Sequence, residues 1–214
     1  MLRIALLVAL LFAAVGLVLS AQEHTHMTDA EEARSAPHSQ IVKEHDVTLL
    51  IVEAAEEEAR SIRAGKPVHV ERVRKIVDFF QNFTDQCHHA KEERYYFPVA
   101  RACGGRETGE LLDELINEHT RGRMDLQVIG YLLDTEPQKS SDMIAERLAN
   151  YTRGLRLHIA KENKLLLPST DPRIPHDDAR AVMVAFERLE KVELGEGFHE
   201  KYHELAMELS GKQE

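Results

Sequence analysis

Histidines and glutamates recur along the chain at a spacing that suits metal binding. His88 and Glu92 are four residues apart, and His158 and Glu162 repeat that spacing seventy residues later. On an α-helix, residues at positions i and i+4 lie on the same face, so each pair projects an imidazole and a carboxylate together. The two pairs are therefore candidates either for metal ligation or for buried hydrogen bonding.

The two pairs belong to a longer internal repeat. Each histidine is followed ten residues later by a proline, Pro98 or Pro168, and each pair is preceded by a Glu-His dipeptide, at residues 44–45 and 118–119. The repeat predicts two helical hairpins. Each hairpin contributes one lone histidine and one His/Glu pair.

Apolar neighbours indicate which way these side chains point. Leucine, isoleucine and valine residues recur at helical spacing beside His45, His119 and His158. We therefore expect four imidazoles and two carboxylates to converge on the axis of a helical bundle. Carboxylates without partners in that setting cost several kcal/mol each, or they protonate.

Two interpretations account for this convergence. In one, each glutamate hydrogen-bonds a histidine across the bundle and no metal is present. In the other, the six groups bind metal, and they are too many for one tetrahedral zinc ion. Two octahedral ions bridged by the carboxylates use all six, and imidazole with carboxylate suits iron or manganese. Ferritin-like bundles use Glu-x-x-His, the opposite order. The repetition favours metal.

The elements that position these residues are predicted to be helices. Apolar periodicity indicates helices from about residue 41 to a stop at Gly65, from Pro67 past Phe97, from Thr108 to about 129, and from Ser141 to Leu167. A turn at 171–175 precedes a fifth helix of about twenty residues, beginning at 177 or 178. The predicted fold is all-α: an antiparallel four-helix bundle with an additional C-terminal helix, spanning residues 39–210.

The N-terminus predicts export. One arginine is followed by an apolar run at 4–19 and by small residues, the layout of a signal peptide over residues 1–21. The alternative is a membrane anchor through residues 2–19. A polar linker is expected at 22–38. We expect the protein to be periplasmic or secreted, with no membrane insertion beyond this segment.

Composition narrows the classes of partner. The 214 residues carry 37 acidic and 27 basic side chains, for a net charge of −10. A nucleic-acid-binding protein carries the opposite sign, so nucleic acid is not expected as a partner. Cys87 and Cys103 are expected to be free thiols, because an intervening helix holds them too far apart for a disulfide.

Three segments carry a family resemblance. Residues 87–93 (CHHAKEE), 118–123 (EHTRGR) and 158–163 (HIAKEN) resemble the hemerythrin-like, HHE cation-binding proteins of bacteria. The likeness spans about residues 39–209, and the last helix resembles the tail of some bacterial members. It implies a non-haem di-iron centre in a four-helix bundle, with two iron ions and manganese as the less favoured metal. The implied ligands are His45, His88, Glu92, His119, His158 and Glu162.

The register of the second helix is ambiguous, because His89 and Glu93 have the same spacing as His88 and Glu92. The internal repeat favours His88 and Glu92, because Pro98 lies ten residues after His88. His89 then aligns with Ile159, and we expect His89 and Glu93 to lie off the bundle axis.

The chain also departs from the oxygen-carrying hemerythrins. Their third helix supplies a second histidine where this chain has Arg123. A fifth ligand could come from several residues, and the sequence leaves the choice open. The candidates are His38, His69, His89, Tyr151 and His203.

Three functions are compatible with these features. The favoured one is a di-iron protein that binds or senses a small molecule, O2 or NO, or holds iron under redox stress. An oxidoreductase on the same site, a peroxidase or an NO-handling enzyme, is the second; no haem or flavin motif accompanies it, so it needs an external reductant. The third is a metal-free helical interaction protein.

Overall fold

The computed structural model describes residues 29–211, and side chains are described for residues 36–211. Every regular element in this part of the chain is a helix, as expected for an all-α fold. The predicted signal peptide at 1–21 lies outside the described residues. No helix among the described residues is long and apolar enough to span a membrane.

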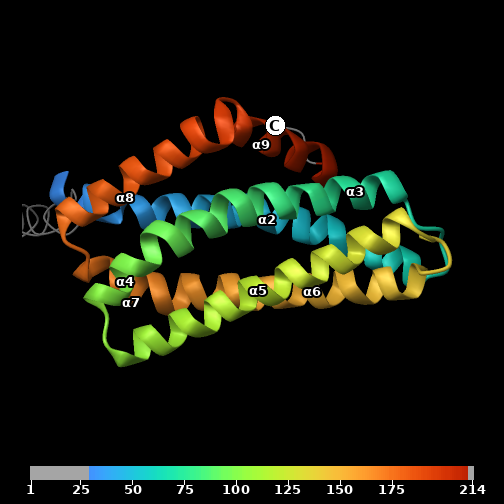
Figure 1. Ribbon diagram of the computed structural model, residues 1–214, viewed down its shortest axis with the longest axis horizontal. Coiled ribbons are helices and arrows are strands. Elements are labelled where there is room, and N and C mark those ends of the chain that lie inside the picture. The colour runs from blue at the N-terminus through green and yellow to red at the C-terminus, as the bar shows by residue number, and fades with distance from the viewer. Residues whose placement is uncertain (1–28, 212–214) are drawn as a thin grey trace, which may run out of the picture.

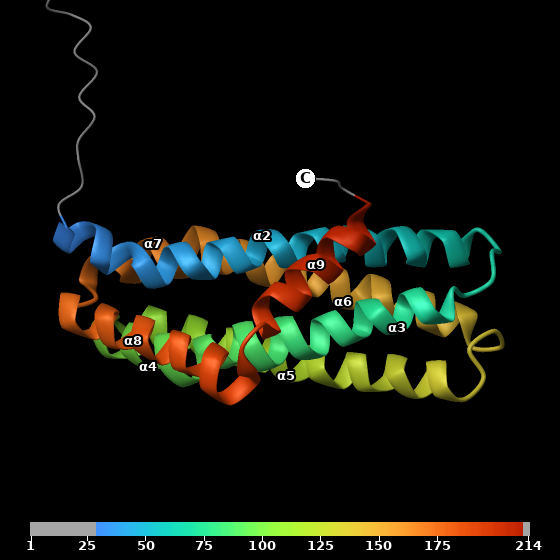
Figure 2. The same ribbon diagram turned by 90° about the horizontal axis from the view of Figure 1, so that it is seen from above.

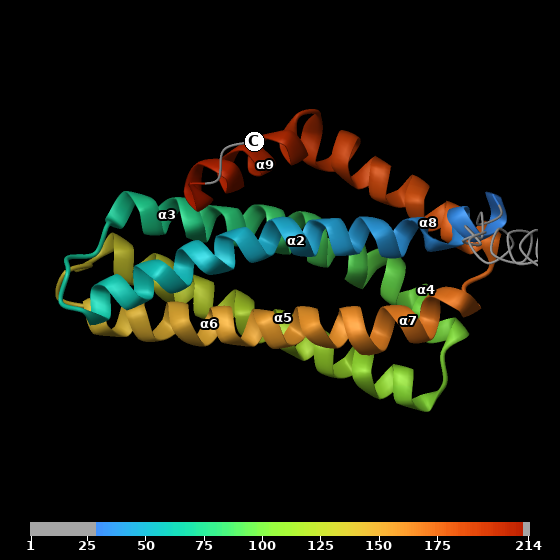
Figure 3. The same ribbon diagram turned by 180° about the vertical axis from the view of Figure 1, so that it is seen from behind.

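Four long helical stretches lie lengthwise beside one another (Figures 1 and 3). The first is α2, Asp29–Arg63, and the third is α5, Arg106–Asp134. The second comprises α3 Val70–Phe79, η1 Phe80–His89, η2 Glu92–Tyr96 and α4 Phe97–Cys103. The fourth comprises α6 Ser141–Lys161, η3 Glu162–Leu166 and α7 Leu167–Thr170.

Helix α2 begins at Asp29, inside the segment 22–38 that we expected to be a linker. The first helix therefore begins earlier than the start expected at about residue 41. Residues 29–34 are mostly alanine, glutamate and arginine, which have high intrinsic helix propensities.

The second and fourth stretches contain wide π-helical turns. Segments η1, η2 and η3 are π-helical. Segments η2 and η3 end at Tyr96 and Leu166, two residues before Pro98 and Pro168. Proline has no N–H to donate to the carbonyl four residues earlier, and its ring clashes with that carbonyl. A wide turn relieves this conflict. The repeated prolines therefore explain why the helix widens just after Glu92 and Glu162.

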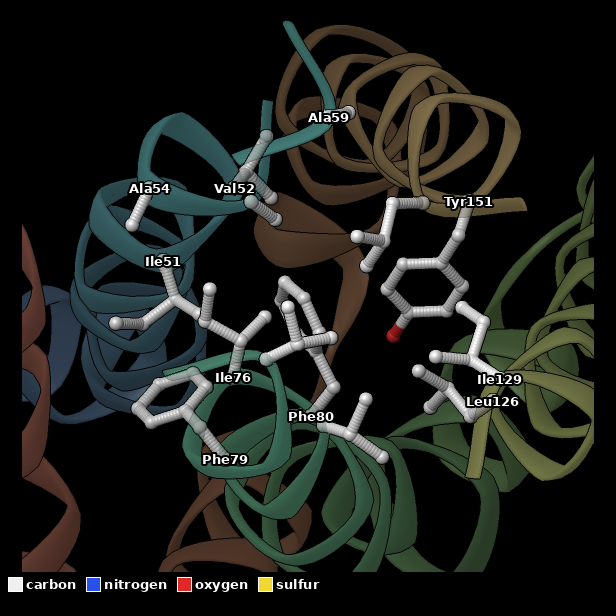
Figure 4. Close-up of a cluster of buried hydrophobic side chains, with 14 of the residues drawn as sticks. Ile51, Val52, Ala54, Ala59, Ile76, Phe79, Phe80, Leu126, Ile129 and Tyr151 are labelled. Atoms are coloured by element: carbon white, nitrogen blue, oxygen red, sulfur yellow. The ribbon is translucent and has the colours of Figure 1, made fainter. Parts of the chain in front are cut away.

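Buried apolar side chains form two clusters along the bundle. One includes Ile51, Ile76, Phe80, Ile129 and Tyr151, which four helical stretches direct toward one another (Figure 4). The other includes residues from the opposite end of each stretch: Ile41, Tyr96, Phe97, Leu112 and Leu166. On the first three stretches the predicted histidines and glutamates lie between the two clusters in sequence. On the fourth, Glu162 lies between them and His158 is flanked by Leu155 and Ile159 of the first apolar cluster. The apolar clusters thus hold a polar layer from both ends.

The additional C-terminal helix is in fact two helices. Helix α8 spans His176–Arg188, η5 spans Leu189–Gly195, and α9 spans Phe198–Ser210. The helix of about twenty residues expected from 177 or 178 corresponds to α8 with η5, and α9 follows a bend at which Gly195 and Gly197 adopt positive φ angles of 99° and 79°. Figures 1 and 2 show this C-terminal segment, 176–210, lying across α2 and α3.

The core position Ile129 offers a direct test of this packing. Ile129 is fully buried, whereas Met124 on the same helix is 61% exposed. We expect Ile129→Ala to lower the free energy of unfolding by about 2–5 kcal/mol, because it leaves a cavity. Met124→Ala should change it by less than about 0.5 kcal/mol. Urea unfolding followed by circular dichroism measures both, and equal effects would contradict the packing described here.

Candidate metal centre

Two groups of potential ligands meet in the polar layer. His45, His88, Glu92 and Glu162 have ligand atoms within 4.8 Å of one another, and so do His89, Glu92, His119 and His158. We call these the first and second clusters. Seven side chains take part, because Glu92 belongs to both clusters. All seven are buried.

The two carboxylates lie between the clusters. One oxygen of Glu92 is 3.5 Å from Nε2 of His88, and the other is 3.6 Å from Nε2 of His119. The oxygens of Glu162 lie 3.1 Å from Nε2 of His45 and 3.2 Å from Nε2 of His158. Each carboxylate therefore presents one oxygen to each cluster. This is the arrangement that two bridging carboxylates require.

Five imidazoles are oriented by outer hydrogen-bond partners. In each of them Nδ1 bonds a side-chain oxygen outside the clusters, at 2.7–3.4 Å. With Nδ1–H as the donor, Nε2 of a neutral ring carries a lone pair that points into the cluster; Nε2 of His119 and Nε2 of His158 lie 3.0 Å apart there. Histidines that bind metal are held in this way. The pairs are His45–Asn163, His88–Glu44, His89–Asp85, His119–Glu93 and His158–Glu118.

Several inward atoms lack a hydrogen-bond partner among the described residues. They are Nε2 of His45 and His89, Oε2 of Glu92 and both oxygens of Glu162. Buried polar atoms are nearly always paired, and leaving one unpaired costs roughly 1–3 kcal/mol. Five such atoms facing a common centre are explained by a cation that they bind. The donor set of imidazole and carboxylate fits iron, as the sequence predicts.

Burial keeps most of these imidazoles neutral. Burial lowers the pKa of His88 to about 4. The pKa values of His89 and His119 are also below the ordinary value, chiefly because of burial and, for His89, of the neighbouring His119. A neutral imidazole is the form that ligates metal, so no proton must leave these three residues before a cation binds.

His158 and the two glutamates carry the remaining charge. Burial opposes a charge on His158, but Glu162 and Glu118 outweigh it and raise its pKa to about 9. Burial would also raise the pKa of Glu162, yet His158 and His45 bring it well below its usual range. Burial and the neighbouring Glu162 raise the pKa of Glu92 well above its usual range. Without metal, the surroundings thus favour charge on His158 and Glu162 and oppose it on Glu92.

The expectation that His89 lies off the axis is wrong. His89 is 5% exposed, and its ring stacks on that of His119 with centroids 3.7 Å apart. The π-helical η1 explains this, because a wider helix turns each successive residue by a smaller angle. His88 and His89 consequently both face inward, one toward each cluster. Glu93 does lie outside, where it accepts the hydrogen bond from His119.

A signal for His89 was present in the repeat. Its counterpart Ile159 is buried as well, at 4% exposure. An isoleucine at the matching position indicates that this position faces the core in both hairpins. Glu93 and its counterpart Asn163 are also equivalent, because each bonds Nδ1 of the lone histidine in the other hairpin.

The other four candidates for a fifth ligand are placed elsewhere. His38 lies beside Asp171, and His69 beside Glu58. His203 packs on Phe83, and Tyr151 packs on Phe80 in the apolar cluster. None of the four belongs to a cluster among the described residues.

Lysine and arginine side chains bond the outer carboxylates. Lys91 bonds Glu44, and Lys161 bonds Glu118, so the internal repeat extends to this layer. Arg123 stands where the oxygen-carrying proteins have a histidine, and it bonds Asp85 at 2.7 Å and Glu93 at 2.6 Å. The residue that departs from the family pattern therefore fixes the outer partners of His89 and His119.

A cavity of about 250 Å³ reaches the second cluster. His89, His119 and His158 form part of its wall, together with Gly122, Gly154 and other residues of α5 and α6. Gly122 is needed for close packing, since a Cβ there would lie 3.2 Å from the Tyr151 ring. Gly154 has open space where a Cβ would stand.

The raised pKa of His158 predicts how the stability of the metal-free protein depends on pH. Because the folded pKa of about 9 lies above the ordinary 6.5, protonated His158 stabilises the fold fully below pH 6.5. This contribution is lost as pH rises from 6.5 to about 9. In Glu118→Gln one of the two carboxylates is neutral, so the loss should be smaller. Urea unfolding in a chelator at pH 6 and pH 9.5 measures it.

Glu114→Gln is the control, because Glu114 bonds Lys161 but does not contact His158. It should show the same loss of stability as the unmodified protein. If the loss were as large in Glu118→Gln as in the control, the assignment of the raised pKa to these carboxylates would be wrong.

Comparison with known proteins agrees with this geometry. The chain matches the model of the hemerythrin HHE cation-binding domain over residues 36–169, a span that contains both clusters. No curated protein and no solved structure matches the chain. Since the match covers more than half of the 214 residues, the chain belongs to the hemerythrin HHE cation-binding family.

Proposed function

We propose that the protein holds two iron ions and binds or senses a small molecule, O2 or NO, at one of them. The first ion would be held by His45, His88 and the bridging carboxylates, and the second by His89, His119, His158 and the same carboxylates. We infer that the four long helical stretches form an antiparallel four-helix bundle around this centre. Iron held there supplies reversible electron transfer toward the bound molecule.

The observation that carries the proposal is the common orientation of five imidazoles. Every one directs Nδ1 to an outer oxygen and Nε2 to the interior. A metal-free polar network would satisfy all of these inward atoms. Nε2 of His119 and Nε2 of His158 lie 3.0 Å apart, within hydrogen-bonding distance, but Nε2 of His45 and His89 and both oxygens of Glu162 have no hydrogen-bond partner among the described residues. The donor set supports iron over zinc, because seven ligands exceed one tetrahedral ion.

The cavity supports a small molecule as the external ligand. It approaches the second cluster only, and its volume of about 250 Å³ suits a molecule of a few atoms. Apolar residues contribute much of the wall: Leu126, Tyr151, Leu155 and Leu157. Charged side chains complete the wall, among them Asp85, Glu118, Arg123 and Lys161. The predicted signal peptide leads us to propose that the protein acts outside the cytoplasm.

Metal analysis of the purified protein tests the proposed centre. We expect about two iron ions per chain, and a change of the optical spectrum when the anaerobic ferrous protein meets O2 or NO. His158→Ala and Glu162→Ala should each lose iron and lower the stability of the iron-loaded protein by a few kcal/mol, because bound metal contributes to folding. His89→Ala should lose the ion of the second cluster.

Glu93→Gln is the matched control for His89→Ala. Glu93 carries a charge next to the centre but bonds only outer atoms of His119 and Arg123. It should keep both ions, with affinity reduced about 10–100-fold, the usual effect of losing an outer partner. Loss of iron from the Glu93 variant and retention in the His89 variant would contradict the ligand set.

Filling the cavity tests the path of the external ligand. Gly154→Leu places a side chain at the cavity wall without a backbone clash, and leucine favours helix more than glycine does. We expect the iron count to stay unchanged and the association of NO to slow several-fold in stopped-flow absorption. Gly130→Leu is the control, because Gly130 is also helical and open but lines a different cavity. Equal rates in both variants would exclude this path.

A further inference from the structure

The two halves of the centre differ in their outer layer. Lys91 and Lys161 occupy equivalent places in the repeat, and each bonds the carboxylate that orients a histidine. Yet the Lys91 side chain is fully buried, whereas that of Lys161 is 26% exposed. The orienting carboxylates differ in the same way, at 2% exposure for Glu44 and 23% for Glu118.

The C-terminal segment causes this difference. Glu190 of η5 bonds the ammonium of Lys91, and the ring of Phe186 lies 5.7 Å from it. Gln40 of α2 donates a hydrogen bond to the same Glu190 oxygen at 2.8 Å. His199 of α9 lies 3.7 Å from Glu44. In Figures 1 and 2, this segment lies over the α2 and α3 side of the bundle.

Among the described residues, Lys161, the counterpart of Lys91 in the second half, bonds no residue of the C-terminal segment. There, the second carboxylate on Lys161 is Glu114, which comes from α5 and is 52% exposed. The open cavity adjoins this half, and Lys161 and Glu118 belong to its wall. Glu190 in the first half thus corresponds to Glu114 in the second half. Each is the second carboxylate that bonds the lysine, but Glu114 belongs to the bundle and is solvent-exposed.

Buried charge makes Glu190 important for His88. A buried ammonium requires its partners, because removing one of them leaves an uncompensated charge in the interior. Lys91 bonds Glu44 and Glu190, and Glu44 also accepts the hydrogen bond from Nδ1 of His88 at 3.0 Å. The position of Glu190 therefore affects Glu44, and through it the direction of Nε2 of His88.

A third metal ion at this place is not what the contacts favour. Glu44, Glu190 and His199 have ligand atoms near one another. The Lys91 ammonium already bonds both carboxylates, however; burial opposes its charge, but Glu44 and Glu190 outweigh burial and raise its pKa. The ammonium therefore takes the place that a metal ion would need and neutralises the two carboxylates that would bind it.

We propose that Glu190 is a positioning residue for His88, acting through Lys91 and Glu44, so that the C-terminal segment makes the two metal positions inequivalent. The ion of the first cluster is sealed and leaves slowly. The ion of the second cluster, which adjoins the cavity, leaves quickly. This inference rests on the proposed two-iron centre and concerns a segment outside the family match at 36–169.

Iron release from the full-length ferrous protein tests the proposal. Under anaerobic conditions, excess ferrozine should remove two ions per chain in two phases of equal amplitude. Glu190→Gln should speed the slow phase about tenfold, the low end of the effect of losing an outer partner, and should leave the fast phase unchanged. Glu114→Gln, the matched control, should change neither phase by more than about twofold, because its ion pair is solvent-exposed.

A double-mutant cycle shows whether Glu190 acts through Lys91. Adding Glu190→Gln to Lys91→Met should have no further effect on the slow phase, since the link between Glu190 and Glu44 is already absent. Circular dichroism of the metal-free variants checks that each one folds. If Glu190→Gln alone failed to fold, His199→Gln would replace it and should also speed only the slow phase.

The outcomes separate the two proposals. Two ions released in a single phase, or a slow phase that Glu190→Gln leaves unchanged, overturns the role of the C-terminal segment and leaves the metal centre standing. Additive effects of Lys91→Met and Glu190→Gln overturn the route through Lys91. A protein that takes up no iron overturns the centre and this inference together.

Discussion

The structure depends on how seven buried ligand groups are kept facing one centre. Five imidazole Nε2 atoms and two carboxylates would repel, protonate or hydrogen-bond elsewhere if their surroundings allowed it. Outer oxygens prevent this by holding each Nδ1, and Lys91, Lys161 and Arg123 hold most of those oxygens. Each layer therefore fixes the one inside it. The centre is preorganised for a cation at the expense of several unpaired polar atoms.

Helix geometry supplies the remaining constraint. An α-helix places residues that are four apart on the same face. This brings each His/Glu pair together, but it does not direct two adjacent histidines toward the same interior. The π-helical segments, which precede the prolines, widen the helix where His88, His89, Glu92 and Glu162 must all face inward. Apolar clusters at both ends of the bundle keep these turns in place. Local irregularity and regular packing thus cooperate to make two adjoining clusters from four helical stretches.

The internal repeat relates the ligand residues of the two hairpins, but the residues around them are not related in this way. The repeated hairpins exchange equivalent partners, since Glu93 and Asn163 each orient the lone histidine of the other hairpin. Around them, the C-terminal segment covers one half and a cavity opens beside the other. Two sites with nearly the same ligands consequently experience different solvation. In our proposal, this difference allows one position to retain an ion while the other meets a small molecule.

The sequence by itself determined the helical class, the inward direction of six ligand candidates and the family, because helical periodicity and an internal repeat are local properties of the chain. Tertiary structure decided the rest. His89 joined the second cluster because a π turn changes the angle between neighbours, and the four-residue rule does not anticipate such a turn. The C-terminal segment reached Lys91 because α8 packs along α2, which brings Glu190 of the following η5 to the ammonium. Glu44 and Glu190 are far apart in sequence, so only folding brings their charges to one ammonium.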